Sequence, residues 1–153
     1  MEIIRAELKN LNAVLELYKQ YYAYYEHQQP DYYQKAEADE EYCKKIITGD
    51  LDDYLIACSK GEPVGICHVA EKKTPPVGHY VPHRFSVLIN IFVAAPHRGS
   101  GADKALTDMA KEWSKARKLD YMELRVLHLN DFALHFYERE NFEVTAHTMR
   151  CML

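Results

Sequence analysis

The spacing of apolar residues predicts two helices near the N-terminus. A short apolar segment at residues 3–7 is suited to open a sheet. Asn10 can cap the helix that follows, and a second helix is predicted over residues 38–47, ended by Gly49. In the first helix the apolar side chains recur at steps of three and four residues: Leu11, Val14, Leu15, Tyr18, Tyr21, Tyr22 and Tyr25.

The middle of the chain is patterned as strands. Residues 54–58 and 64–69 are mostly apolar and flank a turn at 60–63, which predicts a hairpin. A loop rich in Pro and His follows at 74–83. The run at 85–93 is then almost entirely apolar, as in a central strand buried on both faces.

The last third begins with a glycine-bearing turn over residues 95–103. It leads into an amphipathic helix whose apolar face is formed by Ala105, Leu106, Met109, Ala110, Trp113 and Ala116. A strand is expected at 121–126, then a helix capped by Asn130 or Asp131, and a closing strand at 142–144. The order β-α-α-β-β-β-α-β-α-β predicts one α/β (α+β) domain over residues 1–153.

Composition narrows the class of protein. The 153 residues are 48% apolar and 27% charged, which is the balance of a folded globular chain of one-domain size. No apolar run approaches the roughly 18 residues of a membrane helix, and no secretory leader is visible, so we expect a cytoplasmic protein without a membrane partner. The net charge of −4 argues against a nucleic-acid partner.

The cysteines and histidines suggest no metal site. The spacing of the four cysteines, Cys43, Cys58, Cys67 and Cys151, fits neither a paired CxxC site nor a disulfide scaffold. We expect reduced thiols, mostly in the core. The eight histidines are scattered and include no HExxH pattern, so no metal cofactor is expected.

The turn from Arg98 to Ala102 carries the candidate chemistry. A helix start offers unpaired N–H groups and partial positive charge to a phosphate, and glycines permit close approach. An alternative is a simple tight turn in which Ser100 caps the helix, with Asp103 at capping-box spacing. A P-loop is excluded because Lys104 follows Asp103, and a dinucleotide fold would place this turn after its first strand.

From about residue 88 to 142 the sequence resembles the GNAT superfamily of N-acetyltransferases, which use acetyl-CoA. The first signature is Arg98-Gly99-Ser100-Gly101-Ala102-Asp103 after Ile91-Phe92-Val93. The second is Asn130 followed by Ala133 and Phe136-Tyr137, with Phe142 after it. The resemblance implies a single domain with a mixed, mostly antiparallel sheet flanked by helices and splayed where acetyl-CoA enters.

The resemblance also implies roles for single residues. Tyr137 would lie near the cofactor sulfur as the general acid, and Asn130 would hydrogen-bond the cofactor arm. Because a phenol has a pKa near 10 and a thiol near 8.5, Tyr137 is better suited to donate a hydrogen bond than to transfer its proton early. The backbones of Phe92 and Val93 would pair with the pantetheine arm. The amides that would cradle the pyrophosphate belong to Arg98, Gly99, Ser100, Gly101, Ala102 and Asp103.

Asp103 departs from the family pattern, which usually has Gly or Ala at this position. Its carboxylate would either repel the pyrophosphate or turn back to the Ser100 amide and complete the helix cap. We prefer the cap, because the spacing fits and an acidic residue suits a first helical turn.

The general base and the acceptor site are less clear. The strand before the turn carries no acid, which leaves His68, His79 and His83, a water relay or an amine bound neutral as alternatives. An acidic run at 37–41 and the first helix can form a groove for a cationic amine, although a solvated face is the simpler interpretation. The groove residues of that helix would be Tyr21, Tyr22, Tyr24, Tyr25 and Glu26.

The expected function is transfer of an acetyl group from acetyl-CoA to a primary amine of a small molecule, by direct attack in a ternary complex. Two alternatives remain, a non-catalytic acyl-CoA sensor and an acetyltransferase of protein N-termini or lysines. The oligomeric state is left open, a homodimer included.

Overall fold

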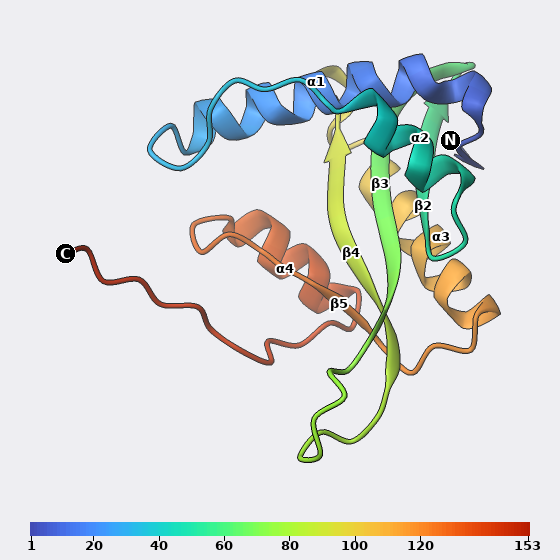
Figure 1. Ribbon diagram of the computed structural model, residues 1–153. Coiled ribbons are helices and arrows are strands. Elements are labelled where there is room, and N and C mark those ends of the chain that lie inside the picture. Colours follow the sequence, from blue (N-terminus) through green and yellow to red (C-terminus); the bar gives the residue numbers. More distant parts are fainter.

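A computed structural model describes residues 1–153 and contains one five-stranded sheet in the order β1-β2-β3-β4-β5 (Figure 1). The first four strands are antiparallel neighbours, and only β4 and β5 run parallel. The predicted mixed, mostly antiparallel sheet is therefore confirmed. The strands are β1 (Glu2–Arg5), β2 (Asp52–Ser59), β3 (Glu62–Lys73), β4 (Arg84–Val93) and β5 (Met122–Leu124).

Helices cover both faces of the sheet because side chains alternate along its strands. In β2, Tyr54 and Ile56 belong to the core beneath α1 and α2, whereas Leu55 and Ala57 belong to the core beneath α3. Figure 1 shows α4 apart from these layers, beside the middle of β4. The helices are α1 (Leu11–Gln28), α2 (Glu40–Thr48), α3 (Ala102–Ala116) and α4 (Asp131–Arg139), with short 3-10 turns η1 (Leu8–Asn10) and η2 (Ala95–His97).

A buried carboxylate fastens α3 to the sheet. Asp53 on β2 is 1% exposed and accepts hydrogen bonds from Trp113 Nε1 on α3 and from Arg5 Nε on β1, each over 2.6 Å. Removing one partner of a buried ion pair typically costs about 3–5 kcal/mol, because the charge that remains lacks its compensation. This contact holds the helix that carries the glycine turn at its N-terminal end.

A β-bulge divides β4 into two halves with different neighbours. Asn90 pairs with His68 and Leu88 pairs with Val69, so Ile89 has no partner on β3. The parallel pairing with β5 covers only Ser86 to Leu88, before the bulge. Beyond Ile89 the edge of β4 is open, and in Figure 1 its upper part has no strand beside it on the side of α4. The predicted splay is present.

The predicted closing strand at 142–144 is wrong. Asn141 adopts a left-handed conformation with φ of 66°, and the Phe142 amide bonds back to the Tyr137 carbonyl over 2.9 Å, which ends α4 as a tight reverse turn. The chain then runs away from the sheet (Figure 1). The observed order is therefore β-α-α-β-β-β-α-β-α, and β5 is three residues long instead of six.

All four cysteines are free thiols, and Cys43, Cys58 and Cys67 are buried, which confirms the prediction of core thiols for these three. Cys151 is exposed. None of the helices combines the length and the apolar character needed to cross a membrane.

Candidate active site

The glycine turn owes its shape to two residues with positive φ. Gly99 has φ of 75° and Gly101 has φ of 85°, in the region that side-chain-bearing residues avoid. A Cβ built on either residue would meet nothing within 4 Å. The two glycines are thus required by backbone conformation and not by crowding.

The predicted Ser100–Asp103 capping box is absent. The residue at the N-cap position of α3 is Gly101, whose left-handed conformation leaves Ser100 outside the helix. The Ser100 amide donates to the His97 carbonyl over 3.2 Å, and Asp103 Oδ1 instead accepts from the amide of Lys104 over 3.0 Å. The Asp103 carboxylate therefore lies in the first turn of α3 and takes no part in a helix cap.

Several amides of this turn have no acceptor in the chain. These are the N–H groups of Gly99, Gly101, Ala102 and Asp103. Together with the helix dipole of the fifteen-residue α3, they form a site suited to a phosphate or pyrophosphate group.

The open half of β4 offers backbone groups beside this turn. The Ala94 amide donates to Val64 on β3 over 2.9 Å. Since antiparallel residues alternate in direction, Phe92 directs its backbone groups to β3, and Ile91 and Val93 direct theirs to the open edge. Sequence reasoning named Phe92 and Val93 and missed Ile91, which the alternation along the strand would have identified.

Arg98 lies over the end of β4. Its Nε donates to the Val93 carbonyl over 3.2 Å, and its guanidinium carbon is 4.6 Å from the centre of the Tyr24 ring and 5.9 Å from that of Phe92. The positive charge predicted for the phosphate site is therefore held, in this structure, between α1 and β4.

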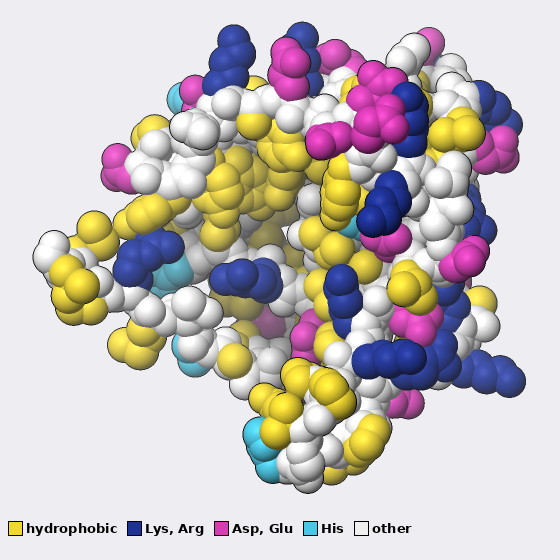
Figure 2. Space-filling view, viewed as in Figure 1, with side chains coloured by type: hydrophobic (Ala, Val, Ile, Leu, Met, Phe, Trp, Pro, Cys, Tyr) yellow, Lys and Arg dark blue, Asp and Glu magenta, His cyan; other side chains and the backbone are white.

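An aromatic wall forms the α1 side of the cleft. It continues from the Arg98 contact along α1, with ring centres of neighbouring members between 4.8 and 6.3 Å apart. Figure 2 shows the corresponding hollow between α1 and α4, with hydrophobic side chains on its inner wall. The wall consists of Tyr21, Tyr24, Tyr25, Tyr33 and Phe92.

Tyr137 is buried on α4, where Phe136 and Phe142 contact its ring edge-on. Its hydroxyl has no hydrogen-bond partner within the chain. Burial raises the pKa of Tyr137 well above the usual value, and the acidic groups of Cys67 and Asp103 raise it further. The phenol therefore stays protonated at neutral pH and can donate a hydrogen bond to a ligand atom.

Asn130 and Glu140 fix the two ends of α4. Asn130 Oδ1 accepts from the Ala133 amide over 3.1 Å, so Asn130 is the predicted cap, and its Nδ2 remains free to donate. At the other end, Glu140 bonds Lys111 and Lys104 of α3 over 3.2 Å each. These contacts join the C-terminal end of α4, where Tyr137 lies, to α3.

None of the three candidate histidines faces the cleft as a free base. His68 is 2% exposed and bonds Asp52 over 3.1 Å, and burial lowers its pKa. His83 bonds Asp120 over 2.8 Å and, with His79, belongs to the β3–β4 loop. That loop joins β4 at the end opposite Val93, roughly 30 Å away at strand rise.

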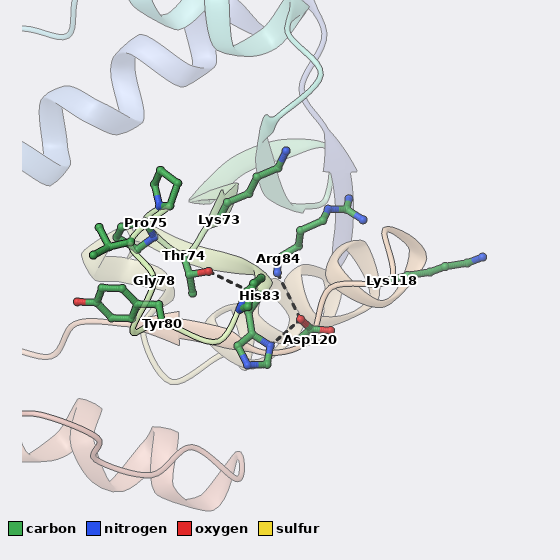
Figure 3. A pocket seen from close by; sticks show the side chains of 12 residues that line it. Lys73, Thr74, Pro75, Gly78, Tyr80, His83, Arg84, Lys118 and Asp120 are labelled. Atoms are coloured by element: carbon green, nitrogen blue, oxygen red, sulfur yellow. Dashed lines mark hydrogen bonds and ion pairs between the residues drawn. The ribbon is translucent and has the colours of Figure 1, made fainter.

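A cavity lies at that distant loop and not at the glycine turn. It has a volume of about 910 Å³ and is open to solvent (Figure 3). Lys73, Thr74, Arg84 and Asp120 line it around His83. Its place at the far end of β4 separates it from the glycine turn and the open strand edge.

The acidic run at 37–41 does not line the cleft. Asp39 caps α2 by accepting from the Tyr42 amide over 2.9 Å, and Glu40 and Glu41 bind Lys44. On β4, the strand that precedes the glycine turn and carries no acidic residue, Asn90 Nδ2 donates to the Tyr18 hydroxyl over 3.1 Å. No three His, Cys, Asp or Glu side chains converge as metal ligands would.

Comparison with known proteins places these features in a family. Residues 11–142 match the model of the acetyltransferase (GNAT) family. No curated protein matches the sequence.

Among solved structures, the tetramutant of the BH1408 protein from Bacillus halodurans superposes with a TM-score of 0.91 at 18% identity, over 100% of both chains. An aminoglycoside acetyltransferase from an uncultured soil metagenomic sample has a TM-score of 0.79 at 16% identity, covering 99% of this chain and 95% of that one. The aminoglycoside N-acetyltransferase AAC(6')-Iy, solved with CoA, has a TM-score of 0.76 at 18% identity, over 99% and 93%. The family match covers most of the chain, and the chain therefore belongs to the GNAT family of acetyltransferases.

Proposed function

We propose that the protein transfers an acetyl group from acetyl-CoA to the primary amine of a small molecule. The observation that carries the proposal is the meeting, in one cleft, of unpaired turn amides, the open edge of β4 and a protonated Tyr137. Each suits a different part of acetyl-CoA, namely the pyrophosphate, the amide-bearing arm and the sulfur.

Different residues bind different parts of acetyl-CoA. The amides at Gly99, Gly101, Ala102 and Asp103 hold the pyrophosphate. The cofactor arm adds to the open edge as a strand does, through Val93 and Ile91, and the free Nδ2 of Asn130 donates to the arm.

Tyr137 acts at the departing sulfur. The neutral amine attacks the thioester carbon, the C–N bond forms, the C–S bond breaks, and the amine proton is lost as the thiolate gains one. Because burial raises the pKa of Tyr137, its hydroxyl stabilises the developing thiolate as a hydrogen-bond donor and does not surrender its proton early. The acceptor arrives neutral or loses its ammonium proton to water, since no histidine serves as base.

The cleft favours an amine carried on an apolar or aromatic body. Tyr21, Tyr25 and Tyr33 present ring faces and edges, which attract both apolar groups and ammonium. The carboxylates Glu40 and Glu41 are committed to Lys44, so a polycation would find few partners there.

The test is release of free thiol from acetyl-CoA with a panel of amines: an arylalkylamine, a linear alkyl diamine, an aminoglycoside and peptides with free N-termini or lysines. We expect the arylalkylamine to give the highest kcat/KM. Binding of CoA without thiol release for any amine would indicate a sensor, and acetylated peptides seen by mass spectrometry would indicate a protein acetyltransferase. Failure to bind CoA at millimolar concentration would refute the assignment altogether.

A further inference from the structure

The loop between β3 and β4 extends beyond the rest of the molecule. β3 pairs with β2 only as far as Ala70, and β4 pairs with β5 only from Ser86, so beyond these residues the sheet is reduced to the β3–β4 pair. Figure 1 shows the loop below every other element of the fold. We call this loop, residues 74–83, the hairpin tip.

The hairpin tip is largely apolar and contains no Lys, Arg, Asp or Glu. All of residues 75–82 are exposed, including Val77 at 50%, Tyr80 at 48% and Val81 at 71%. Its three prolines lack an N–H group, and four of the seven remaining amides donate within the loop. The tip therefore has few polar backbone groups that would lose hydration in an apolar environment.

Four basic residues lie directly behind the tip. Lys72 and Lys73 end β3, Arg84 begins β4, and Lys118 follows α3 and lines the same cavity as Lys73. We call these four residues the basic cluster. Figure 2 shows hydrophobic and histidine side chains at the lower end of the molecule and Lys and Arg side chains above them.

The charge of the basic cluster is only partly compensated. Glu71, whose side chain is 7% exposed, binds Arg84 over 2.7 Å, whereas the three lysines form no ion pair. Lys73 also lies directly opposite Arg84 across the hairpin, and like charges in this position destabilise a strand pair. The stability of the hairpin does not account for this arrangement, but attraction to an anionic partner would.

The cavity of about 910 Å³ lies between the tip and the basic cluster. Asp120 is the only acid that lines it, and its Oδ2 accepts from His83 Nδ1 over 2.8 Å. Figure 3 shows Pro75 and Tyr80 on one side of this pair and Lys118 on the other. A hollow with an apolar side and a basic side is suited to an anionic group that is attached to an apolar body.

We propose that the hairpin tip and the basic cluster form a docking surface for an anionic lipid bilayer. Val77, Tyr80 and Val81 enter the interfacial region, and the basic cluster binds the negative head groups, one of them in the cavity. A projecting tip suits a deformable lipid surface, whereas a folded partner would need a groove of matching shape. Such peripheral attachment requires no helix that crosses the bilayer.

The charge of the whole chain orients it on the bilayer. The net charge is −4, so the surfaces outside the basic cluster are repelled by anionic lipid. The protein therefore meets the bilayer with the hairpin tip first. The glycine turn follows Val93 at the opposite end of β4 and remains in solution.

The first experiment is cosedimentation of the full chain with vesicles of phosphatidylcholine, either pure or with about one-third phosphatidylserine. We expect binding to the anionic vesicles only, and weaker binding as the salt concentration rises. Each basic residue near the surface contributes about fivefold to affinity, so neutralising the three lysines should weaken binding at least about tenfold. The variant is Lys72→Gln with Lys73→Gln and Lys118→Gln. The matched control removes the same charge from exposed lysines elsewhere: Lys19→Gln with Lys45→Gln and Lys60→Gln.

The second experiment tests the apolar tip. Val77→Ser with Val81→Ser should weaken binding several-fold and leave the melting temperature unchanged, because both side chains are exposed. Tyr80→Trp should report entry into the bilayer by a shift of its emission to shorter wavelength with anionic vesicles. The control Tyr42→Trp, at an exposed position of α2, should show no shift.

Three results would overturn the proposal. They are no binding to anionic vesicles at low salt, binding that the lysine and valine variants leave unchanged, and an equal shift of emission at positions 80 and 42. Binding of polyglutamate more tightly than vesicles, without any effect of the valine substitutions, would overturn it in favour of an acidic protein partner. None of these measurements depends on acetyl transfer, so they test the docking surface separately from the proposed function.

Discussion

Arg98 Nε donates to the Val93 carbonyl over 3.2 Å, so the side chain that begins the glycine turn is bonded to the last residue of the open strand edge. The same guanidinium stacks on Tyr24 of α1. One residue thus joins the two parts of the cleft that are expected to hold the pyrophosphate and the arm of CoA, and its removal affects both.

Arg98→Gln should weaken CoA binding by about tenfold at low salt and less at high salt, because the lost attraction to phosphate is screened by ions. Arg98→Lys should restore the salt-dependent part of the affinity but not the stacking on Tyr24. Calorimetric titration at two salt concentrations measures both effects. A loss of equal size at both concentrations would assign Arg98 to the packing of α1 against β4 alone.

Gly101→Val should lower CoA affinity at least about tenfold, because strain at φ of 85° displaces the amides that are proposed to bind the pyrophosphate. The chain supplies a matched control in Gly61, which has φ of 86°, equally open space and a position in the β2–β3 turn. Gly61→Val should lose comparable stability, about 1–2 kcal/mol, with CoA affinity unchanged. Equal affinities of the two variants for CoA would show that Gly101 shapes only the fold.

Tyr137→Phe should reduce kcat by about 10²–10⁴-fold while CoA affinity stays within a few-fold, since only the hydroxyl is lost. Because the pKa of Tyr137 is raised, the wild-type rate should show no loss from ionisation of this group as the pH rises to about 9. Tyr42→Phe, at an exposed tyrosine of α2, is the control and should be neutral. If the Tyr137→Phe enzyme kept at least half the wild-type kcat under conditions where chemistry limits the rate, Tyr137 would have a structural role only.

Asp103→Asn tests the carboxylate that the family pattern lacks. Asp103 does not form a capping box, so its negative charge in the first turn of α3 should repel the pyrophosphate. Removal of the charge should therefore tighten CoA binding several-fold at low salt. The fold should lose about 0.3–1 kcal/mol from the helix dipole. Unchanged affinity at low salt would mean that the carboxylate points away from the bound phosphate.

Stability should depend on pH through His68. Burial lowers its pKa below the ordinary value of 6.5, so just below pH 6.5 the unfolded chain binds more protons than the folded one. The free energy of unfolding therefore falls as the pH drops through this window, by at most about 1.4 kcal/mol per pH unit. Urea unfolding between about pH 7.5 and 5.5 measures the slope. His68→Gln should flatten it, and an unchanged slope would attribute it to other groups.

Local patterns were sufficient to predict most of the elements and the turn that forms the candidate site. The alternation of side chains predicted the paired strands, and the glycines around Ser100 predicted the turn before α3, because both depend on neighbouring residues alone. The left-handed conformation of Gly101 makes this glycine the N-cap and removes the Ser100 cap, although the spacing of Ser100 and Asp103 fits a capping box.

The predictions that failed depended on long-range geometry. Phe142-Glu143-Val144 has the composition of a strand, but no edge of its own chain lies where Asn141 directs it. His83 is a reasonable base by its chemistry, yet the length of β4 separates it from the glycine turn that follows Val93. The acidic run fits the simpler interpretation of a solvated face, and here the reason is local, since Glu40 and Glu41 bind Lys44 one helical turn away.

The unpaired residue in β4 lets one strand contribute to both cores. Leu88 and Phe92 lie four positions apart, and in a regular strand they would share a face. Because Ile89 is inserted between the pairs Leu88–Val69 and Asn90–His68, Leu88 instead belongs to the core beneath α3 and Phe92 to the core beneath α1. The bulge thus acts as a half-turn of the ribbon, and it moves the strand from one layer of the molecule to the other shortly before the glycine turn.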